Sequence, residues 1–251
     1  MVIYCAGNTK ASQYAAQMLG KAGIHVAAKP EDSVTHLLLD VPSFGEKGLL
    51  RSGGKMDALL SVLPNNITVC GGNLNHPLLE EYRKIDLLQD AEYLAQNAYI
   101  TAECALDVAL PYLEITIRNC PTLIIGWGRI GKCLGQLLKN MGADIAIAAR
   151  KETDRAMIRA LGMKAVDIND LPDQLDRYRR IFNTAPELVL KREQMVHCRE
   201  DCVKIDLASK PGMEDEDVII AKGLPGIHFP ESSGSLIAQT LLRLFSKEEI
   251  L

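Results

Sequence analysis

The sequence predicts an α/β protein made of two open parallel-sheet domains. Two observations predict this class. Short apolar strand patterns alternate with helical patterns along both halves of the 251-residue chain, which is typical of a parallel sheet. In the second half, a glycine-rich turn links an apolar strand at 122–125 to an amphipathic helix, which is the chain order of a βα unit.

Composition excludes several classes of protein. Hydrophobic residues make up 47% and charged residues 24% of the chain, an ordinary globular balance. The net charge of −4 comes from 28 basic and 32 acidic residues without a basic stripe, so we expect no nucleic-acid partner. No signal segment and no run of about 18 apolar residues occurs, so we expect a cytoplasmic protein without membrane contact.

The seven cysteines form no CxxC pair, and we expect reduced thiols. Cys198 and Cys202 stand four residues apart beside His197. No second pair of ligands has the spacing that a metal needs, so we predict that there is no metal site.

The first half of the chain predicts a small α/β domain. Strand patterns occupy residues 2–6, 25–28, 35–40 and 67–70, and residues 85–90 form a further strand or turn. Helical patterns occupy 12–21 and 74–83. A longer helical pattern over 101–118 contains Pro111, which predicts a kink or break. We interpret it as the connection between the domains.

The second half predicts strands at 122–125, 145–149, 180–183 and 203–207, and a last amphipathic helix at about 233–245. The expected domains are a substrate-side α/β domain (1–98) and a Rossmann NAD(P)-binding domain (99–231). A C-terminal helix (232–251) follows, for which packing back on the first domain is one option.

The glycine turn has the pattern GxGxxG at Gly126, Gly128 and Gly131. The first glycine permits a tight turn, the second lets a pyrophosphate approach the backbone, and the third lets helix and strand pack closely. Free N–H groups and the helix dipole then face the phosphates. The strand before the turn and the helix after it meet the contextual test for a dinucleotide site. The alternative is a glycine-rich turn without a ligand.

The end of the next strand bears on the choice of cofactor. NAD sites usually carry Asp or Glu there, bonded to the ribose 2′-hydroxyl, whereas this chain has Arg150 and Lys151. A guanidinium suits a 2′-phosphate, so we predict NADP rather than NAD. The alternative is a solvated arginine at a strand end.

Three polar turns follow later strands: Asn183–Pro186, Asp206–Gly212 and Gly223–Ile227. Such turns line the ligand crevice of an open α/β sheet, although Asn183–Pro186 is equally explained as a simple turn. We expect a rigid turn at Gly223–Ile227. The predicted cofactor site comprises Gly126, Trp127, Gly128, Arg129, Ile130, Gly131, Arg150, Lys151, Asn183, Thr184, Ala185 and Ala208.

These motifs resemble those of the A-type subunits of the dipicolinate synthase family. IGWGRIG, NTAP, DLASKPG and GLPGI occur in that family's order, and the segment from Asn97 to Glu103 resembles its stretch before the interdomain helix. The resemblance covers roughly residues 90–245. It implies a two-domain NADP-dependent oxidoreductase that oxidises a dihydrodipicolinate-type intermediate to dipicolinate during spore formation, together with a flavoprotein-like B-type partner. We also expect an oligomer.

The resemblance implies further roles for residues of this chain. A substrate cleft would contain Asn97, Thr101 and Glu103, with Ser209 and Lys210 opposite. Lys210 and the amino end of a helix starting near Thr101 would attract a dianionic substrate, and Glu103 or His228 would accept a proton. The implied catalytic residues are Glu103, Ser209, Lys210 and His228, and the implied substrate residues are Asn97, Thr101, Leu224, Pro225 and Gly226.

The chain departs from the family pattern after GLPGI. The family continues with Pro-Lys-Thr-Ala-Gly, whereas this chain has Glu231 at the lysine position. Ile100 replaces an expected proline, and Met213 replaces a second glycine. Two alternatives to hydride transfer on dihydrodipicolinate therefore stay open. One is a nucleotide-binding regulatory protein without chemistry of its own, and the other is a dehydrogenase of another small carboxylate, of the 2-hydroxyacid or shikimate type.

Overall fold

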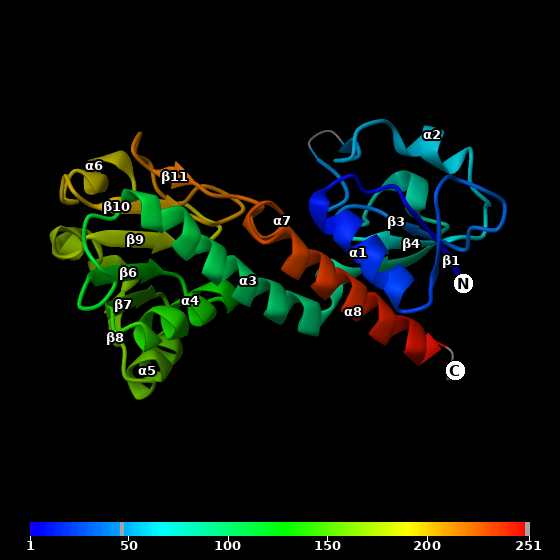
Figure 1. Ribbon diagram of the computed structural model, residues 1–251. Coiled ribbons are helices and arrows are strands. Elements are labelled where there is room, and N and C mark those ends of the chain that lie inside the picture. Colours follow the sequence, from blue (N-terminus) through cyan, green and yellow to red (C-terminus); the bar gives the residue numbers. More distant parts are fainter. Residues whose placement is uncertain (46–47, 249–251) are drawn as a thin grey trace. The chain divides into compact units, whose positions relative to one another are not determined.

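The computed structural model describes residues 1–45 and 48–248 (Figure 1). The chain divides into two compact units. Unit 1 contains Met1–Asn97 together with the segment that begins at Pro225, and unit 2 contains Ala98–Leu224. The functional domains expected at 1–98, 99–231 and 232–251 stay a prediction, and residues 249–251 of the last one lie outside the described residues.

Unit 1 is built on a parallel sheet of five strands in the order β2-β1-β3-β4-β5. The strands are β1 (Val2–Cys5), β2 (His25–Ala27), β3 (His36–Leu38), β4 (Thr68–Gly71) and β5 (Arg83–Asp86). Its helices are α1 (Lys10–Lys21), α2 (Met56–Leu60), the start of α3 (Ala91–Ala109), α7 (Leu224–His228) and α8 (Pro230–Glu248). Helix α8 lies along α1 (Figure 1). A Cβ on Gly234 of α8 would stand 2.5 Å from the Ala11 carbonyl oxygen of α1, so glycine allows this close approach.

Unit 2 contains a parallel sheet of six strands in the order β11-β10-β9-β6-β7-β8. The strands are β6 (Pro121–Ile125), β7 (Asp144–Ala149), β8 (Lys164–Asp167), β9 (Arg180–Asn183), β10 (Val203–Asp206) and β11 (Ile219–Ile220). The helices are α4 (Arg129–Asn140), α5 (Glu152–Ala160), α6 (Arg192–Met195) and the later part of α3. The predicted α/β class with two parallel sheets is confirmed.

The strand order of unit 2 reverses direction between β6 and β9. The chain builds outward from β6 to β7 and β8, and then returns to β9 and continues to β10 and β11 on the other side. In open α/β sheets, ligands bind beyond the carboxyl ends of the strands at such a reversal. Because the glycine turn follows β6, the topology places it at this point.

Three expected elements are wrong in their bounds or type. The connecting helix α3 begins at Ala91 rather than Thr101, because the Asp90 carboxylate accepts a hydrogen bond from the Tyr93 N–H at 2.8 Å and caps the first turn. It ends at Ala109, two residues before Pro111, whose ring disfavours a continued helix. Residues 74–83 contain only a 3₁₀ turn before β5. The segment expected as a rigid turn at Gly223–Ile227 forms most of α7.

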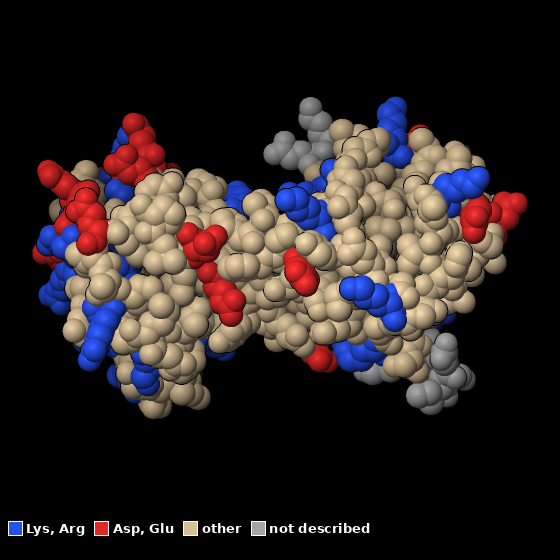
Figure 2. Space-filling view, in the orientation of Figure 1, with Lys and Arg blue, Asp and Glu red and all other residues tan. Residues whose placement is uncertain are grey.

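The charged side chains of the described residues do not segregate by sign on the face drawn in Figure 2. Lys and Arg lie interspersed with Asp and Glu there, so that face offers no continuous basic track. Within the described part of the chain, no helix combines the length and apolar character that a bilayer crossing requires.

Candidate nucleotide site

The glycine turn of unit 2 takes the conformation that its sequence predicts. Gly126 has a φ of +102°, a conformation that side-chain-bearing residues rarely adopt. Its N–H donates to the Ala148 carbonyl at 2.9 Å, which extends the sheet into the turn. A Cβ on Gly131 would stand 2.2 Å from the Gly126 carbonyl oxygen. Glycine at both positions therefore lets α4 begin directly against the end of β6.

Gly128 has a different role, because it faces open space. A Cβ there would meet nothing within 4 Å, and its φ of −77° is accessible to any residue. Gly128 occupies the N-cap of α4 and has no side chain to accept the first N–H groups of the helix. Bare amides at the positive end of a helix form an anion site. The geometry therefore fits a pyrophosphate approaching the backbone at Gly128.

Two cationic side chains and the indole of Trp127 lie beside the glycine turn. Arg129 is exposed at the first position of α4, and the Lys132 ammonium lies 5.7 Å from the centre of the Trp127 ring. Trp127 and Ile130 are half-buried. These side chains are available around the turn, and Trp127 is the single tryptophan of the chain.

Asn183 and Thr184 support the turn rather than offer free polar groups. The Thr184 N–H and hydroxyl both donate to the Ile125 carbonyl, at 2.8 and 2.9 Å. A Cβ on Gly126 would stand 2.7 Å from the Thr184 hydroxyl oxygen. Asn183 is fully buried, and its amide side chain bonds the backbone N–H and C=O of Ala185. The Asn183 and Thr184 side chains thus have protein partners, and their expected contacts with the nucleotide stay a prediction.

A buried carboxylate joins the turns after β9 and β10. Asp206 accepts hydrogen bonds from the Asn183 side-chain amide (3.1 Å), the Ala208 N–H (3.0 Å) and the Gly212 N–H (2.7 Å). A Cβ on Gly212 would stand 2.4 Å from the Asn183 side-chain nitrogen. Ala208 is buried and its N–H is used. The two expected cofactor-binding turns are therefore one network held by Asp206, a residue to which the sequence assigned no role.

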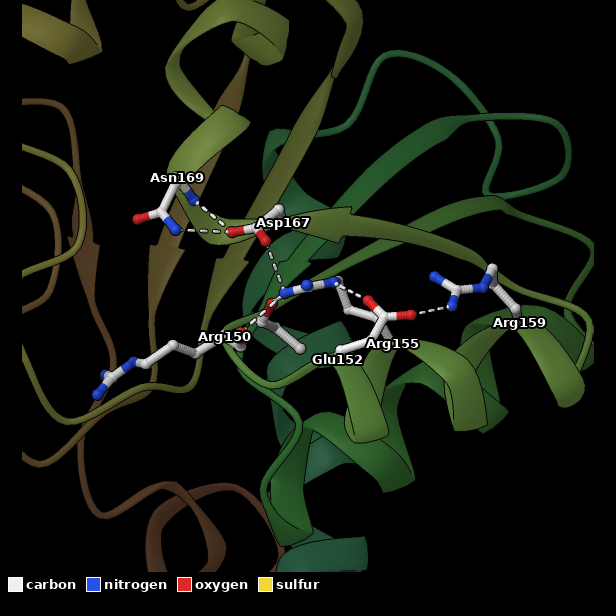
Figure 3. A network of polar contacts seen from close by, with 7 residues as sticks. Arg150, Glu152, Arg155, Arg159, Asp167 and Asn169 are labelled. Atoms are coloured by element: carbon white, nitrogen blue, oxygen red, sulfur yellow. Dashed lines mark hydrogen bonds and ion pairs between the residues drawn. The ribbon is translucent and has the colours of Figure 1, made fainter.

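The loop after β7 is held by Arg155. One guanidinium nitrogen of Arg155 contacts the Ala149 carbonyl (2.9 Å), the Arg150 carbonyl (2.8 Å) and the Asp167 carboxylate (2.8 Å). The same guanidinium bonds Glu152 at 3.0 Å. Figure 3 shows this cluster, with the Arg150 side chain pointing away from it. Because Arg155 fixes the loop backbone, Arg150 is presented from a rigid base.

Arg150 points toward a carboxylate. Its guanidinium forms an ion pair with Glu187, and both side chains are at least half exposed. The two residues line a mainly polar cavity of about 280 Å³, together with side chains that include Asn169, Leu188 and Gln194. The two residues directly after β7 are cations, but the turn after β9 brings a carboxylate to Arg150. Glu187 was missed at the level of sequence, although its position directly after the NTAP turn was a usable signal. Lys151 is exposed at the N-cap of α5.

The residues implied for the substrate lie in both units. Ser209 and Lys210 are exposed in the loop after β10, beyond the carboxyl edge of the unit 2 sheet. Leu224 is 4% exposed, and its expected role in substrate binding stays a prediction. Pro225 and Gly226 are half-buried in α7. His228 is half-buried at the end of α7, within unit 1.

Helix α3 does not carry the expected three-residue set on one face. Asn97 and Thr101 are four residues apart and share a face, whereas Glu103 is rotated about 160° from Thr101 at about 100° per residue. Thr101 is buried and Glu103 is exposed. Because α3 begins at Ala91, no free helix amides exist near Thr101, and the anion site expected there is wrong.

The chain is similar in sequence and in fold to known proteins. The A-type subunit of dipicolinate synthase from Bacillus subtilis is 24% identical over 171 residues, which are 65% of this chain and 58% of that protein. The crystal structure of the A-type subunit of dipicolinate synthase from Bacillus halodurans superposes with a TM-score of 0.84 at 22% identity, covering 97% of this chain and 96% of that one. The predicted resemblance to the A-type subunit of dipicolinate synthase is confirmed.

A second curated relative matches a shorter stretch. The NADP⁺-dependent shikimate dehydrogenase of Clostridium botulinum is 33% identical over 109 residues, which are 41% of this chain and 42% of that enzyme. The chain thus matches less than two thirds of the length of either curated relative. No protein-family model matches the chain. The likeness in structure establishes a two-sheet α/β fold of the kind seen in the A-type subunit of dipicolinate synthase.

Proposed function

We propose that the chain is a nicotinamide-dinucleotide-dependent oxidoreductase similar to the A-type subunit of dipicolinate synthase. The observation that carries the proposal is the turn at Gly128, where a helix N-terminus without a capping side chain faces open space at the reversal of the sheet. That arrangement binds a diphosphate through backbone amides. The names of both curated relatives describe enzymes, and one of them uses NADP⁺.

The proposed reaction removes two electrons from a dihydropyridine dicarboxylate. The glycine turn at Gly126–Gly131 would hold the dinucleotide, which would supply the hydride acceptor. Loss of a hydride from the substrate ring, with the accompanying proton taken up by a base, would leave the aromatic dicarboxylate. Ser209 and Lys210 lie beyond β10, on the β9–β10 side of the sheet reversal. Lys210 would attract a substrate carboxylate and Ser209 would donate a hydrogen bond to it. The proton-acceptor roles of Glu103 and His228 stay predictions, as do a B-type partner and an oligomeric state.

We further propose NADP as the preferred cofactor. Arg150 and Lys151 are exposed cations directly after β7, at the positions where a carboxylate would favour NAD. A 2′-phosphate there would gain a charge-assisted hydrogen bond from Arg150. It would also have to displace Glu187 from Arg150, so Glu187 limits the preference for NADP.

The activity is tested with the purified chain, alone and with a B-type partner of the dipicolinate synthase kind. Freshly generated dihydrodipicolinate precursor and NADP⁺ are added, and the absorbance band of the reduced nicotinamide is followed. We expect the band to rise. Nucleotide binding without any reduction in either preparation would favour the alternative of a regulatory nucleotide-binding protein. Failure to bind any dinucleotide would reject both.

Substitutions at the Arg150–Glu187 pair test the choice of cofactor. We expect Glu187→Gln to tighten NADP⁺ binding about 5-fold, because an exposed ion pair is worth up to about 1 kcal/mol, and to leave NAD⁺ binding nearly unchanged. Arg150→Gln should weaken NADP⁺ binding about 10-fold. Titration calorimetry with both nucleotides gives the ratios. Glu193→Gln, an exposed carboxylate of α6 outside the cavity, is the matched control. If the ratio of NADP⁺ affinity to NAD⁺ affinity were equal in the unaltered chain and the three variants, the proposal would be contradicted.

A further inference from the structure

A second cavity lies at the amino edge of the unit 2 sheet, opposite the nucleotide turn. Its volume is about 380 Å³. Residues at the starts of β9 and β10 line it, together with residues 112–115, which follow α3. We call it the amino-edge cavity. The proposed nucleotide site uses the carboxyl edge of the same sheet, so the two sites share no lining residue.

Arg180, the first residue of β9, lines this cavity and is 1% exposed. Its Nη2 donates to the carbonyl groups of Ile115 (2.9 Å) and Thr116 (3.2 Å). Its Nε and Nη1 have no acceptor among the described residues, and both are covered by protein atoms. A guanidinium has five N–H donors and stays charged, so a buried positive charge here has unused donors.

No acid compensates this charge within the described part of the chain. Burial lowers the pKa of Arg180, and the neighbours that influence it are Cys120 and Arg179 rather than a carboxylate. The other two cations of the cavity wall are paired, Arg179 with Asp201 at 2.9 Å and Lys204 with Asp215 at 2.7 Å. A buried charge without a partner is costly. A negatively charged group placed in the cavity would therefore stabilise Arg180 more than it would stabilise any other lining residue.

The remaining lining residues restrict which anion fits. Leu113, Val203 and Ile219 supply apolar wall, whereas Glu114, Glu200 and Asp217 add negative charge. Those acids repel a phosphate or a nucleotide with several negative charges. A single carboxylate on an apolar body suits both the wall and Arg180.

We propose that the amino-edge cavity is a binding site for a small monocarboxylate with an apolar body, whose carboxylate accepts hydrogen bonds from Arg180. Because Nε and Nη1 are covered, binding requires a small rearrangement of the wall. The segment 112–115 is the part expected to move, since the carbonyl of its last residue, Ile115, holds Nη2. The site is independent of the proposed oxidoreductase activity.

The test uses the full-length ¹⁵N-labelled chain and benzoate, with benzamide as a neutral probe of the same shape. We expect benzoate to cause saturable shifts of the backbone amide resonances of residues 113–115 and 202–204. Benzamide should bind at least about 10-fold more weakly, because a hydrogen bond to a charged group contributes about 1.5–3 kcal/mol. Arg180→Met should weaken benzoate binding by a similar factor and leave benzamide binding unchanged.

Two further variants control the interpretation. Arg177→Met removes an exposed cation that lies outside the amino-edge cavity, and it should bind benzoate like the unaltered chain. Leu113→Trp fills the cavity without changing its charge, so it should abolish benzoate binding. This variant tests the proposal also if Arg180→Met does not fold. Equal shifts with benzoate and benzamide, or binding that survives Leu113→Trp, would overturn the proposal. Concentration-dependent broadening of the same resonances without a probe would also overturn it, by identifying a second copy of the chain as the occupant.

Discussion

Gly128→Val is expected to weaken dinucleotide binding at least about 100-fold while the protein remains folded. The added side chain meets nothing within 4 Å and the backbone conformation suits any residue, so no protein contact is lost. The isopropyl group would occupy the space in which a pyrophosphate approaches the helix amides. A loss of about 100-fold corresponds to about 2.7 kcal/mol of binding free energy. Titration calorimetry with NADP⁺ measures it.

Gly20→Ala is the matched control for Gly128→Val, because a Cβ at Gly20 meets only a Val26 methyl at 3.9 Å and lies in unit 1. Its NADP⁺ affinity should equal that of the unaltered chain. Thermal unfolding should occur at the same temperature in Gly128→Val and in the unaltered chain. NADP⁺ binding by a folded Gly128→Val protein at unchanged affinity would reject the glycine turn as the nucleotide site and, with it, the proposed function.

Asp206→Ala is expected to destabilise unit 2 by about 3 kcal/mol or more. Asp206 is 1% exposed, and its carboxylate accepts hydrogen bonds from Asn183, Ala208 and Gly212. Its removal leaves three buried donors without an acceptor, each at a cost of about 1 kcal/mol or more. Urea unfolding followed by the fluorescence of Trp127, the single tryptophan and a residue of unit 2, measures the change.

Asp201→Ala provides the comparison for Asp206→Ala. Asp201 lies just before β10, the strand that ends at Asp206, but its side chain is 42% exposed and its partners are the side chains of Arg179 and Arg199. Exposed ion pairs contribute about 1 kcal/mol or less, so this variant should unfold close to the unaltered chain. Equal stability of the two variants would show that the Asp206 network does not hold the turns after β9 and β10.

The elements that the sequence predicted well are those whose signals are local. The strand before Gly126, the turn and helix α4 follow from an apolar run, glycine spacing and helical periodicity within about 20 residues. The start predicted for α3 lies ten residues after the observed one, because the helix begins at the Asp90 cap, ahead of the apolar pattern that predicts it. Helix α7 was missed because Pro225 and Gly226 usually indicate a turn, whereas proline is tolerated in the first turn of a helix.

The residues of the candidate site also divide into those that local patterns predict and those that they do not. The parallel α/β class and the glycine turn could be predicted from sequence, because strand alternation and glycine spacing act over neighbouring residues. Three other features became visible in the folded chain alone: Glu187 reaches Arg150, Asp206 holds Asn183, and Arg180 lies buried at the amino-edge cavity without an acid partner among the described residues. Such pairings join the ends of different strands, and their distances depend on strand order and register, which no local pattern encodes.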